Sequence, residues 1–287
     1  LQSNIVLPSK NFIGRDKELD NIKEELDNYG KVFIKGIGGI GKSEIAKMFC
    51  KKYRSDFNTI VFANYKTDIK DMVISEKEMP IKNLERITDR EGKIENDITF
   101  FKRKLQILKK ITDTKTLIIV DNFDIEEDEY LEEFLDGNYK IIFTTRNDFE
   151  HLGYPIIEIN PLTEENNLEL FYTNCKFRIT NTEKLKEIIR IVKGHTLAII
   201  LIAKFMQNNR MQAEDMYNLL KSNGIKEIEG NIKYSFNNRS MYDYIKTLFN
   251  MSKLNNEETY IVMNLSILPN DGIELTKFAK LCEIDDY

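Results

Sequence analysis

The chain has 287 residues, a length that suits two or three small domains better than one. Hydrophobic residues make up 41% of it and charged residues 31%, a balance typical of globular proteins and not of disordered ones. The formal net charge of −5 gives no overall attraction to nucleic acid or to anionic membranes. Neither is therefore the expected partner, although a local basic patch is compatible with this charge.

The cysteines and the apolar runs indicate a cytoplasmic protein. Cys50, Cys175 and Cys282 lie far apart and form no C-x-x-C pair, as expected for reduced thiols. The longest apolar run, 197–203, is much shorter than the roughly 20 residues that span a bilayer. The first residue is Leu1 rather than methionine, and we expect the sequence to be a piece of a longer protein.

The first half of the chain alternates helical and strand-like patterns. In chain order, the patterns predict a helix over 15–29, a strand over 32–34, a helix over 43–54, a strand over 59–64, an irregular or partly helical insertion over 66–94, and a helix over 96–112. Continuous apolar runs at 117–120, 141–143 and 156–159 predict strands that helices bury on both faces. This order predicts an α/β fold with a doubly wound parallel sheet.

The pattern changes after Pro161. Helical periods and recurring Ser/Thr-type caps occupy 163–224, and helical patterns return over 240–287. We therefore expect an α/β domain over 1–160, a small helical domain over 161–230 and a further domain over 231–287.

A glycine-rich motif at 36–43, GIGGIGKS, satisfies the phosphate-binding pattern G-x-x-x-x-G-K-[ST] between a predicted strand and a predicted helix. Its glycines let successive N–H groups turn toward a phosphate, and the start of the helix adds the positive end of its dipole. Lys42 is expected to reach the β- and γ-phosphates, and the hydroxyl of Ser43 to bind Mg²⁺. The alternative, a glycine-rich turn with an incidental lysine, lacks this strand–helix context.

An acidic residue follows a buried strand, as a phosphate site of this kind requires. Asp121 ends the apolar run of TLIIVDNFD at 116–124 and is expected to hold Mg²⁺. The alternative is a strand-terminal Asp that begins a turn with Asn122. Asn122 occupies the position where many ATPases carry the hydrolytic base. Asp124 can take that role, or it is a solvated residue that opens an acidic helix over 125–134.

Arg146 lies at the end of the predicted strand in IIFTTRN, at the sheet edge where ligands bind in α/β folds. It is a candidate for contact with a γ-phosphate. The alternative is an arginine paired with a surface carboxylate.

Together these segments resemble the STAND class of P-loop NTPases, and within it the NB-ARC family of apoptotic protease-activating factors, plant resistance proteins and bacterial relatives. The resemblance is carried by FIGR at 12–15 with Glu18 and Leu19, GIGGIGKS at 36–43, IIVDNFD at 118–124, IIFTTR at 141–146, and Pro161-Leu162-Thr163 with Glu164, Leu170 and Phe171. A sixth segment, GHTLA at 194–198, resembles the family's G-[LH]-P-L-A but has Thr196 where the family has a proline that lies against adenine. His195 is expected to be a satisfied histidine rather than a phosphate ligand.

The resemblance implies ATP or ADP with Mg²⁺ as the bound ligands. It implies an adenine pocket lined by Leu7, Pro8 and Ile13, with Arg15 at the nucleotide or at the domain boundary. The implied binding set comprises Gly36, Gly38, Gly39, Ile40, Gly41, Lys42, Ser43 and Glu44 at the phosphates, and Thr196 and Leu197 beside them. The implied catalytic set is Lys42, Asp121, Asp124 and Arg146, with Ser43 and Asp121 as metal ligands.

The resemblance also implies a signalling switch with slow ATP hydrolysis. ADP would hold the domains closed, ATP would drive self-association, 231–287 would begin a winged helix, and effector and sensor domains would lie outside this sequence. Antiviral defence is the expected role, with regulation of transcription as the runner-up. Two other classes stay open: a DNA-binding ATPase of the replication-initiator or archaeal type, and a nucleotide-locked scaffold without catalysis.

Overall fold

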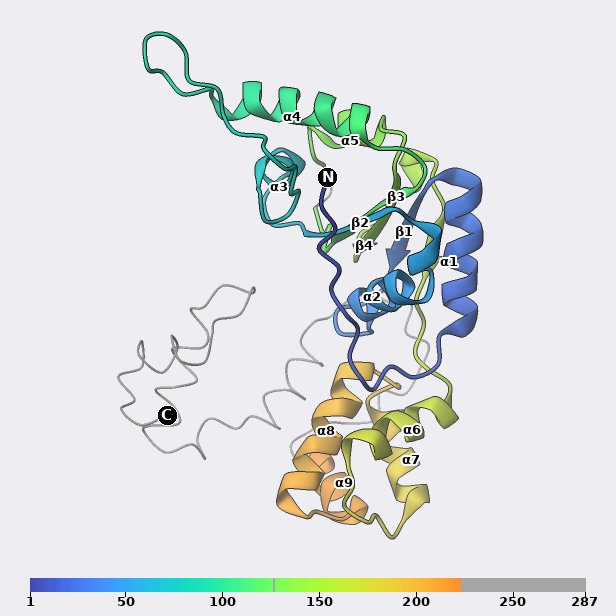
Figure 1. Ribbon diagram of the computed structural model, residues 1–287. Coiled ribbons are helices and arrows are strands. Elements are labelled where there is room, and N and C mark those ends of the chain that lie inside the picture. The colour runs from blue at the N-terminus through green and yellow to red at the C-terminus, as the bar shows by residue number, and fades with distance from the viewer. Residues whose placement is uncertain (126, 223–287) are drawn as a thin grey trace, which may run out of the picture.

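The computed structural model describes residues 1–125 and 127–222 (Figure 1). The five strands are β1 (Lys31–Lys35), β2 (Thr59–Asn64), β3 (Thr116–Asp121), β4 (Lys140–Thr145) and β5 (Ile156–Glu158). They form one parallel sheet in the order β2-β3-β4-β1-β5. The predicted α/β fold with a parallel sheet is confirmed.

Helices cover both faces of the sheet. The helices of this α/β unit are α1 (Asp16–Tyr29), α2 (Lys42–Lys52), α3 (Ile69–Ile74), α4 (Asp97–Ile111) and α5 (Leu131–Leu135). One buried cluster joins α1 and α2 to side chains such as Val32 and Ile34, and the other joins α3, α4 and α5 to the opposite face at Phe33. Successive strand residues point to opposite faces, so burial on both faces explains why the strands read as continuous apolar runs.

The first fourteen residues, which we call the N-terminal strap, run along the open edge of β2 and then past α2 to α1 (Figure 1). Ser3 Oγ accepts the N–H of Ile60 at 3.1 Å, and Asn4 Oδ1 accepts that of Phe62 at 2.6 Å. The backbone N–H of Asn4 donates to Ile60 O at 3.2 Å, and its side-chain amide donates to Phe62 O at 3.1 Å. The strap thereby satisfies hydrogen-bonding groups at the edge of the sheet.

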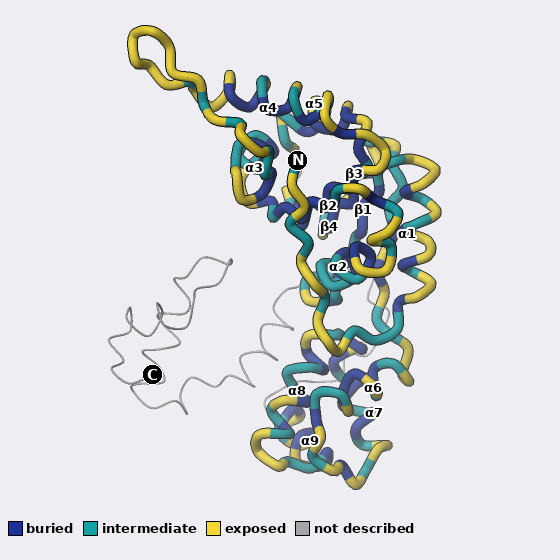
Figure 2. Tube along the Cα trace, viewed as in Figure 1, coloured by how far each residue is buried: buried dark blue, intermediate teal, exposed yellow. Residues whose placement is uncertain are grey.

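The predicted insertion at 66–94 contains α3 and a loop that projects away from the body, with Thr88 and Ile94 paired across it. Figure 2 shows this loop as a largely exposed segment. The expected helix over 125–134 is wrong in its extent, because α5 begins only at Leu131. Asp128 explains the difference: its Oδ2 accepts the N–H of Ile69 at 2.7 Å and ties this segment to the start of α3.

The helical unit consists of α6 (Glu164–Asn174), α7 (Thr182–Ile191), α8 (Thr196–Asn209) and α9 (Ala213–Ser222) around a separate apolar core. Thr163 caps α6, as the sequence predicts, through the N–H of Asn166. Helix α7 begins at Thr182, and its cap is Asn181, the residue before it. The expected winged helix over 231–287 lies outside the described residues. None of the helices in the described part of the chain has the length and apolar character needed to cross a bilayer.

Candidate functional site

The glycine motif forms a loop between β1 and α2 at the carboxyl edge of the sheet. Gly39 and Gly41 adopt φ angles of 77° and 111°, which side chains rarely adopt, so both glycines are required by the path of the loop. The N–H of Gly36 donates to Thr145 O at 3.2 Å, which ties the loop to the end of β4. Helix α2 begins at Lys42, so the free N–H groups of its first turn face the loop.

Lys42 is buried, and its ammonium donates to the carbonyls of Gly36 and Ile37 at 2.8 and 3.1 Å. Burial is the main cause that lowers the pKa of Lys42. Asp124 and Asp121 act to raise this pKa and Arg146 acts to lower it. The structure thus brings together the four residues of the predicted catalytic set.

Asp121 ends β3 and is held by Thr144 on the neighbouring strand. Thr144 Oγ1 donates to Asp121 Oδ1 at 2.6 Å and accepts the N–H of Asn122 at 2.9 Å. Asn122 adopts a φ of 61°, and its side-chain amide lies 3.4 Å from Asp121 Oδ2. The Asp121 carboxylate is therefore oriented by a fully buried hydroxyl and not left to rotate in solvent.

Asp124 and Arg146 form a pair beside the loop. Asp124 Oδ1 accepts the backbone N–H of Arg146 at 2.6 Å, and Asp124 Oδ2 lies 3.0 Å from Arg146 Nε. A side-chain carbon added at Gly38 would lie 3.4 Å from Arg146 Cζ, so the guanidinium flanks the glycine loop. Arg146 is thus paired with a carboxylate, as one of its two alternatives predicted. It also lies beside the phosphate loop, where the other alternative, contact with a γ-phosphate, requires it.

The start of α8 contacts the opposite side of the glycine loop. His195 Nε2 lies 2.7 Å from Gly38 O, Leu197 N donates to Gly39 O at 3.1 Å, and Thr196 Oγ1 donates to Ile40 O at 3.0 Å. His195 Nδ1 accepts the N–H of Ala198, so Nε2 carries the proton and is the donor to Gly38. Burial lowers the pKa of His195, although its hydrogen bonds oppose this, and the imidazole is neutral at pH 7. His195 is a satisfied histidine, as expected.

The N-terminal strap reaches the first turn of α2 through Glu44. Glu44 Oε2 accepts the N–H of Ser9 at 2.6 Å, and Glu44 Oε1 pairs with Lys47 at 2.8 Å. Burial acts to raise the pKa of Glu44, but these hydrogen bonds hold it below its usual value. Leu7 is 71% exposed and Pro8 is half-buried, so the strap presents an apolar surface beside α2.

Arg15 and Ile13 lie where the strap meets the helical unit. Ile13 packs against the core of the helical unit, and Arg15 is buried with its Nη1 bonded to Glu18 at 2.7 Å. The buried Nη2 of Arg15 has no hydrogen-bond partner within the described part of the chain. An unpaired buried guanidinium nitrogen costs free energy, which a bound acceptor would recover.

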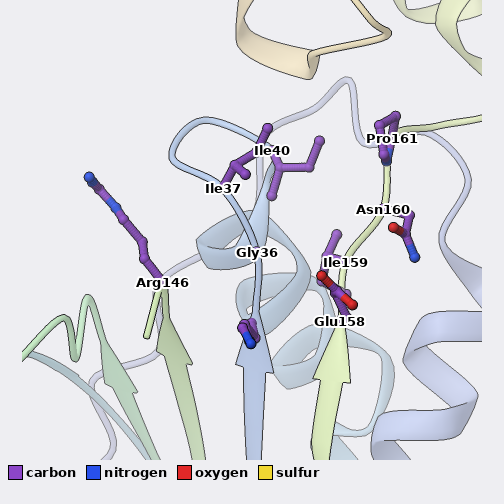
Figure 3. A pocket seen from close by; sticks show the side chains of 9 residues that line it. Gly36, Ile37, Ile40, Arg146, Glu158, Ile159, Asn160 and Pro161 are labelled. Carbon is purple, nitrogen blue, oxygen red and sulfur yellow. The ribbon is translucent and has the colours of Figure 1, made fainter. Parts of the chain in front are cut away.

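A shallow cleft lies beside the glycine loop at the ends of β1 and β5 (Figure 3). It is lined by Lys35, Gly36, Ile37, Ile40, Arg146, Glu158, Ile159, Asn160 and Pro161. In Figure 3, Ile37 and Ile40 project from the glycine loop, and Ile159 to Pro161 belong to the segment that leads from β5 toward the helical unit. Apolar and polar groups are therefore both available at this edge of the sheet.

Sequence reasoning missed Thr144 and Ser9. Thr144 sits one position inside a buried strand, and only the pairing of β3 with β4 brings it to Asp121. Ser9 contributes its backbone N–H, which no residue pattern reveals. The two threonines at 144–145, directly after the predicted strand, are a sequence signal for the first of these.

Comparison with known proteins gives one family match and several similar solved structures. The NB-ARC domain family matches residues 15–181. A Signal Transduction ATPase with Numerous Domains (STAND) protein with a tetratricopeptide repeat sensor from Pyrococcus horikoshii is similar in structure, with a TM-score of 0.57, 22% identity, and coverage of 99% of this chain and 39% of that protein. This chain thus spans well under half the length of that relative.

A Walker-type ATPase of Pyrococcus abyssi is also similar, with a TM-score of 0.50, 15% identity, and coverage of 78% of this chain and 76% of that one. At these identities, both structures show a shared fold. The family match covers the glycine loop at 36–43 and all five strands of the sheet. The chain belongs to the NB-ARC family, and its glycine motif and parallel sheet form a P-loop NTPase fold.

Proposed function

We propose that this chain is the nucleotide-operated part of a signalling switch, closed with ADP and driven into self-association by ATP. The observation that carries the proposal is the contact between α8 and the P-loop, where the helical unit bonds to the loop that binds phosphate. A ligand shifts a balance between arrangements only if it binds them with different affinity. A site formed by two separate units meets that condition, because separating the units changes the site.

The proposed division follows the predicted boundaries. The α/β unit up to residue 160 would hold the phosphates, the helical unit from 161 would close over them, and a winged helix from 231 would complete the switch. Leu7, Pro8 and Ile13 would face the base, and Arg15 would offer its unpaired Nη2 to the ligand or to the moving boundary. Effector and sensor domains would be joined to this part of the protein.

Mg²⁺ would be held by Ser43 and Asp121. Hydroxyl and carboxylate oxygens are the hard donors that this cation prefers, and Asp121 is buried and already oriented by Thr144. An ion held there would supply positive charge to offset that of the phosphates. We propose slow hydrolysis, because Asn122 cannot accept a proton and Asp124 is engaged with Arg146.

The first test is to denature freshly purified protein and identify the released nucleotide by chromatography. Near-stoichiometric ADP supports the closed switch. Exchange into ATP with Mg²⁺ should then raise the mass measured by light scattering, and Lys42→Met protein should stay at its starting mass. Protein that is empty on purification and binds duplex DNA in a salt-sensitive way would instead favour the DNA-binding ATPase.

A further inference from the structure

We infer that residues 195–197, here called the α8 latch, fix the P-loop backbone from outside, and that Thr196 is a positioning residue acting through Ile40 rather than an adenine contact. The inference rests on the proposed function for its effect on nucleotide affinity. The latch itself is a property of the protein alone, so it can be tested without any ligand.

Three consecutive residues bond to three consecutive carbonyls. His195 donates to Gly38 O, Thr196 donates to Ile40 O, and the backbone of Leu197 donates to Gly39 O, over 2.7–3.1 Å. His195 is 4% exposed, so its bond is shielded from competing water. A run of contacts this regular constrains the loop at every peptide unit between Gly38 and Gly41.

The geometry of the peptide unit makes these contacts relevant to phosphate. In a trans peptide the C=O of one residue and the N–H of the next point in opposite directions, and no cis bonds occur in the described part of the chain. Since the carbonyls of Gly38 and Ile40 point at α8, the N–H groups of Gly39 and Gly41 point away from it. The latch thus favours the orientation in which the loop presents donors on its other side.

Close packing strengthens the same constraint. A side-chain carbon added at Gly39 would lie 2.7 Å from His195 Cε1 and 3.0 Å from Leu197 Cβ, so the loop and α8 approach as closely as glycine permits. The loop cannot change its curl at Gly39 without pushing α8 away. Conversely, movement of the helical unit would break three bonds to the loop.

Thr196 occupies the first position of α8, where the resemblance places a proline. Proline suits the first turn of a helix but has neither a hydroxyl nor an N–H to donate. Thr196 keeps a helix-compatible residue there and adds a bond to the P-loop. Its hydroxyl is already committed to Ile40 O, which is why we assign it to the loop rather than to a base.

The experiment compares Thr196→Val, which removes the donor and keeps the branched shape, with Thr196→Ser, which keeps the hydroxyl. The matched control is Thr182→Val, the same change at the first position of α7, far from the loop. Amide hydrogen exchange is followed by mass spectrometry in peptides covering 36–43 and 195–200, without nucleotide. Thr196→Val should speed exchange in both peptides, while Thr196→Ser and Thr182→Val should match the wild type.

Nucleotide affinity is then measured by calorimetry with ADP and Mg²⁺. Loss of one hydrogen bond predicts a dissociation constant about three- to tenfold higher for Thr196→Val, with recovery in Thr196→Ser. Unchanged exchange in Thr196→Val would overturn the latch, and so would a loss of thermal stability with affinity intact. If Thr196→Val does not fold, Thr196→Ala replaces it with the same two outcomes. Wild-type protein with no affinity for nucleotide would refute the proposed function, while the exchange data would still decide the latch.

Discussion

The carboxylate of Asp124 holds Arg146 at two points, the backbone N–H at 2.6 Å and the side-chain Nε at 3.0 Å. Asp124 follows β3 and Arg146 follows β4, so the pair joins the ends of two neighbouring strands beside the P-loop. Both oxygens of the Asp124 carboxylate are engaged in this pair, and Nε of Arg146 is not available to a phosphate. While this pair persists, each of the two side chains is therefore less available for its predicted role at the nucleotide.

The first prediction is that Asp124→Ala and Arg146→Ala are coupled. Each single variant should lower ATP turnover because it removes a polar group from beside the P-loop. The loss in the double variant, as a free energy, should be smaller than the sum of the two single losses, because the two residues interact. Turnover is measured by release of inorganic phosphate, together with the ratio of ATP to ADP affinity. Additive losses would show that Asp124 acts by itself, as an independent base would.

The second prediction concerns Lys42. Lys42→Met should weaken binding of ADP and ATP at least tenfold, because it removes a buried ammonium placed at the phosphate loop. The nucleotide-free variant should be as stable as the wild type or more so, because burial disfavours the charge and lowers the pKa of Lys42. Calorimetry and thermal unfolding separate these effects; an equal affinity in the variant would contradict the site.

The third prediction follows from the hydroxyl of Thr144. Thr144→Val should reduce the gain in nucleotide affinity that Mg²⁺ provides, because Asp121 loses its orienting donor and the N–H of Asn122 loses its acceptor. The unsatisfied group should also cost about 1–3 kcal/mol of stability. Thr144→Ser keeps the hydroxyl and serves as the control. A Mg²⁺ titration of ADP affinity that is identical in all three proteins would rule out this role.

The fourth prediction compares two glycines of the P-loop in nucleotide-free protein. Alanine at either position costs about 1–2 kcal/mol for its left-handed backbone. Gly39→Ala should be clearly more destabilising, because its Cβ would meet His195 and Leu197, whereas nothing described lies within 4 Å of a Cβ at Gly41. Chemical denaturation measures the free energy of unfolding of both variants. Equal losses of stability would mean that α8 moves away from the added methyl group without measurable cost.

The fifth prediction is a pH dependence caused by Lys104. This lysine is fully buried and donates to the carbonyls of Ile74 and Ser75 at 3.3 and 3.2 Å. Burial lowers its pKa to about 8, while Glu76 acts to raise it. In the unfolded chain the pKa is about 10.4, so between these values the unfolded state binds more protons and stability rises with pH.

Lys104→Met should therefore be more stable than the wild type at pH 7, by up to about 3 kcal/mol, and the difference should shrink as the pH rises toward 10. Denaturation at pH 7, 8, 9 and 10 measures it. Lys102→Met, on the exposed face of the same helix, provides the control. A constant difference across this range would contradict the assignment.

Much of the α/β unit was predictable from two features of the sequence. Its strands are continuous apolar runs, and its P-loop has a specific spacing of glycine, lysine and serine residues. The strand predicted over 59–64 coincides with β2, and the helix predicted over 15–29 differs from α1 by one residue. The helix predicted over 125–134 is shorter in the structure, and Asp128 in this segment instead bonds to the start of α3, a tertiary contact that composition does not reveal. Local pattern could not report a partner 59 residues away.

The contacts of the individual site residues are harder to predict from the sequence. Residue patterns predicted Asp124 and Arg146 near the nucleotide, and the family resemblance predicted Thr196 there. Neither predicted that Asp124 and Arg146 bind each other or that Thr196 bonds to Ile40. Those facts depend on strand order and on how α8 docks. Side-chain direction is set by packing, which one sequence does not display.

The N-terminal strap also limits how far the sheet can grow. Along β2, the hydroxyl of Ser3 and the amide of Asn4 stand in for part of a neighbouring backbone. Side chains used in this way satisfy the strand but leave no regular row of groups for another strand to copy. At the opposite edge, β5 is only three residues long, and so short an edge strand disfavours pairing with a strand of another molecule. A protein proposed to assemble through its nucleotide state thereby has two sheet edges that disfavour uncontrolled pairing with a second copy.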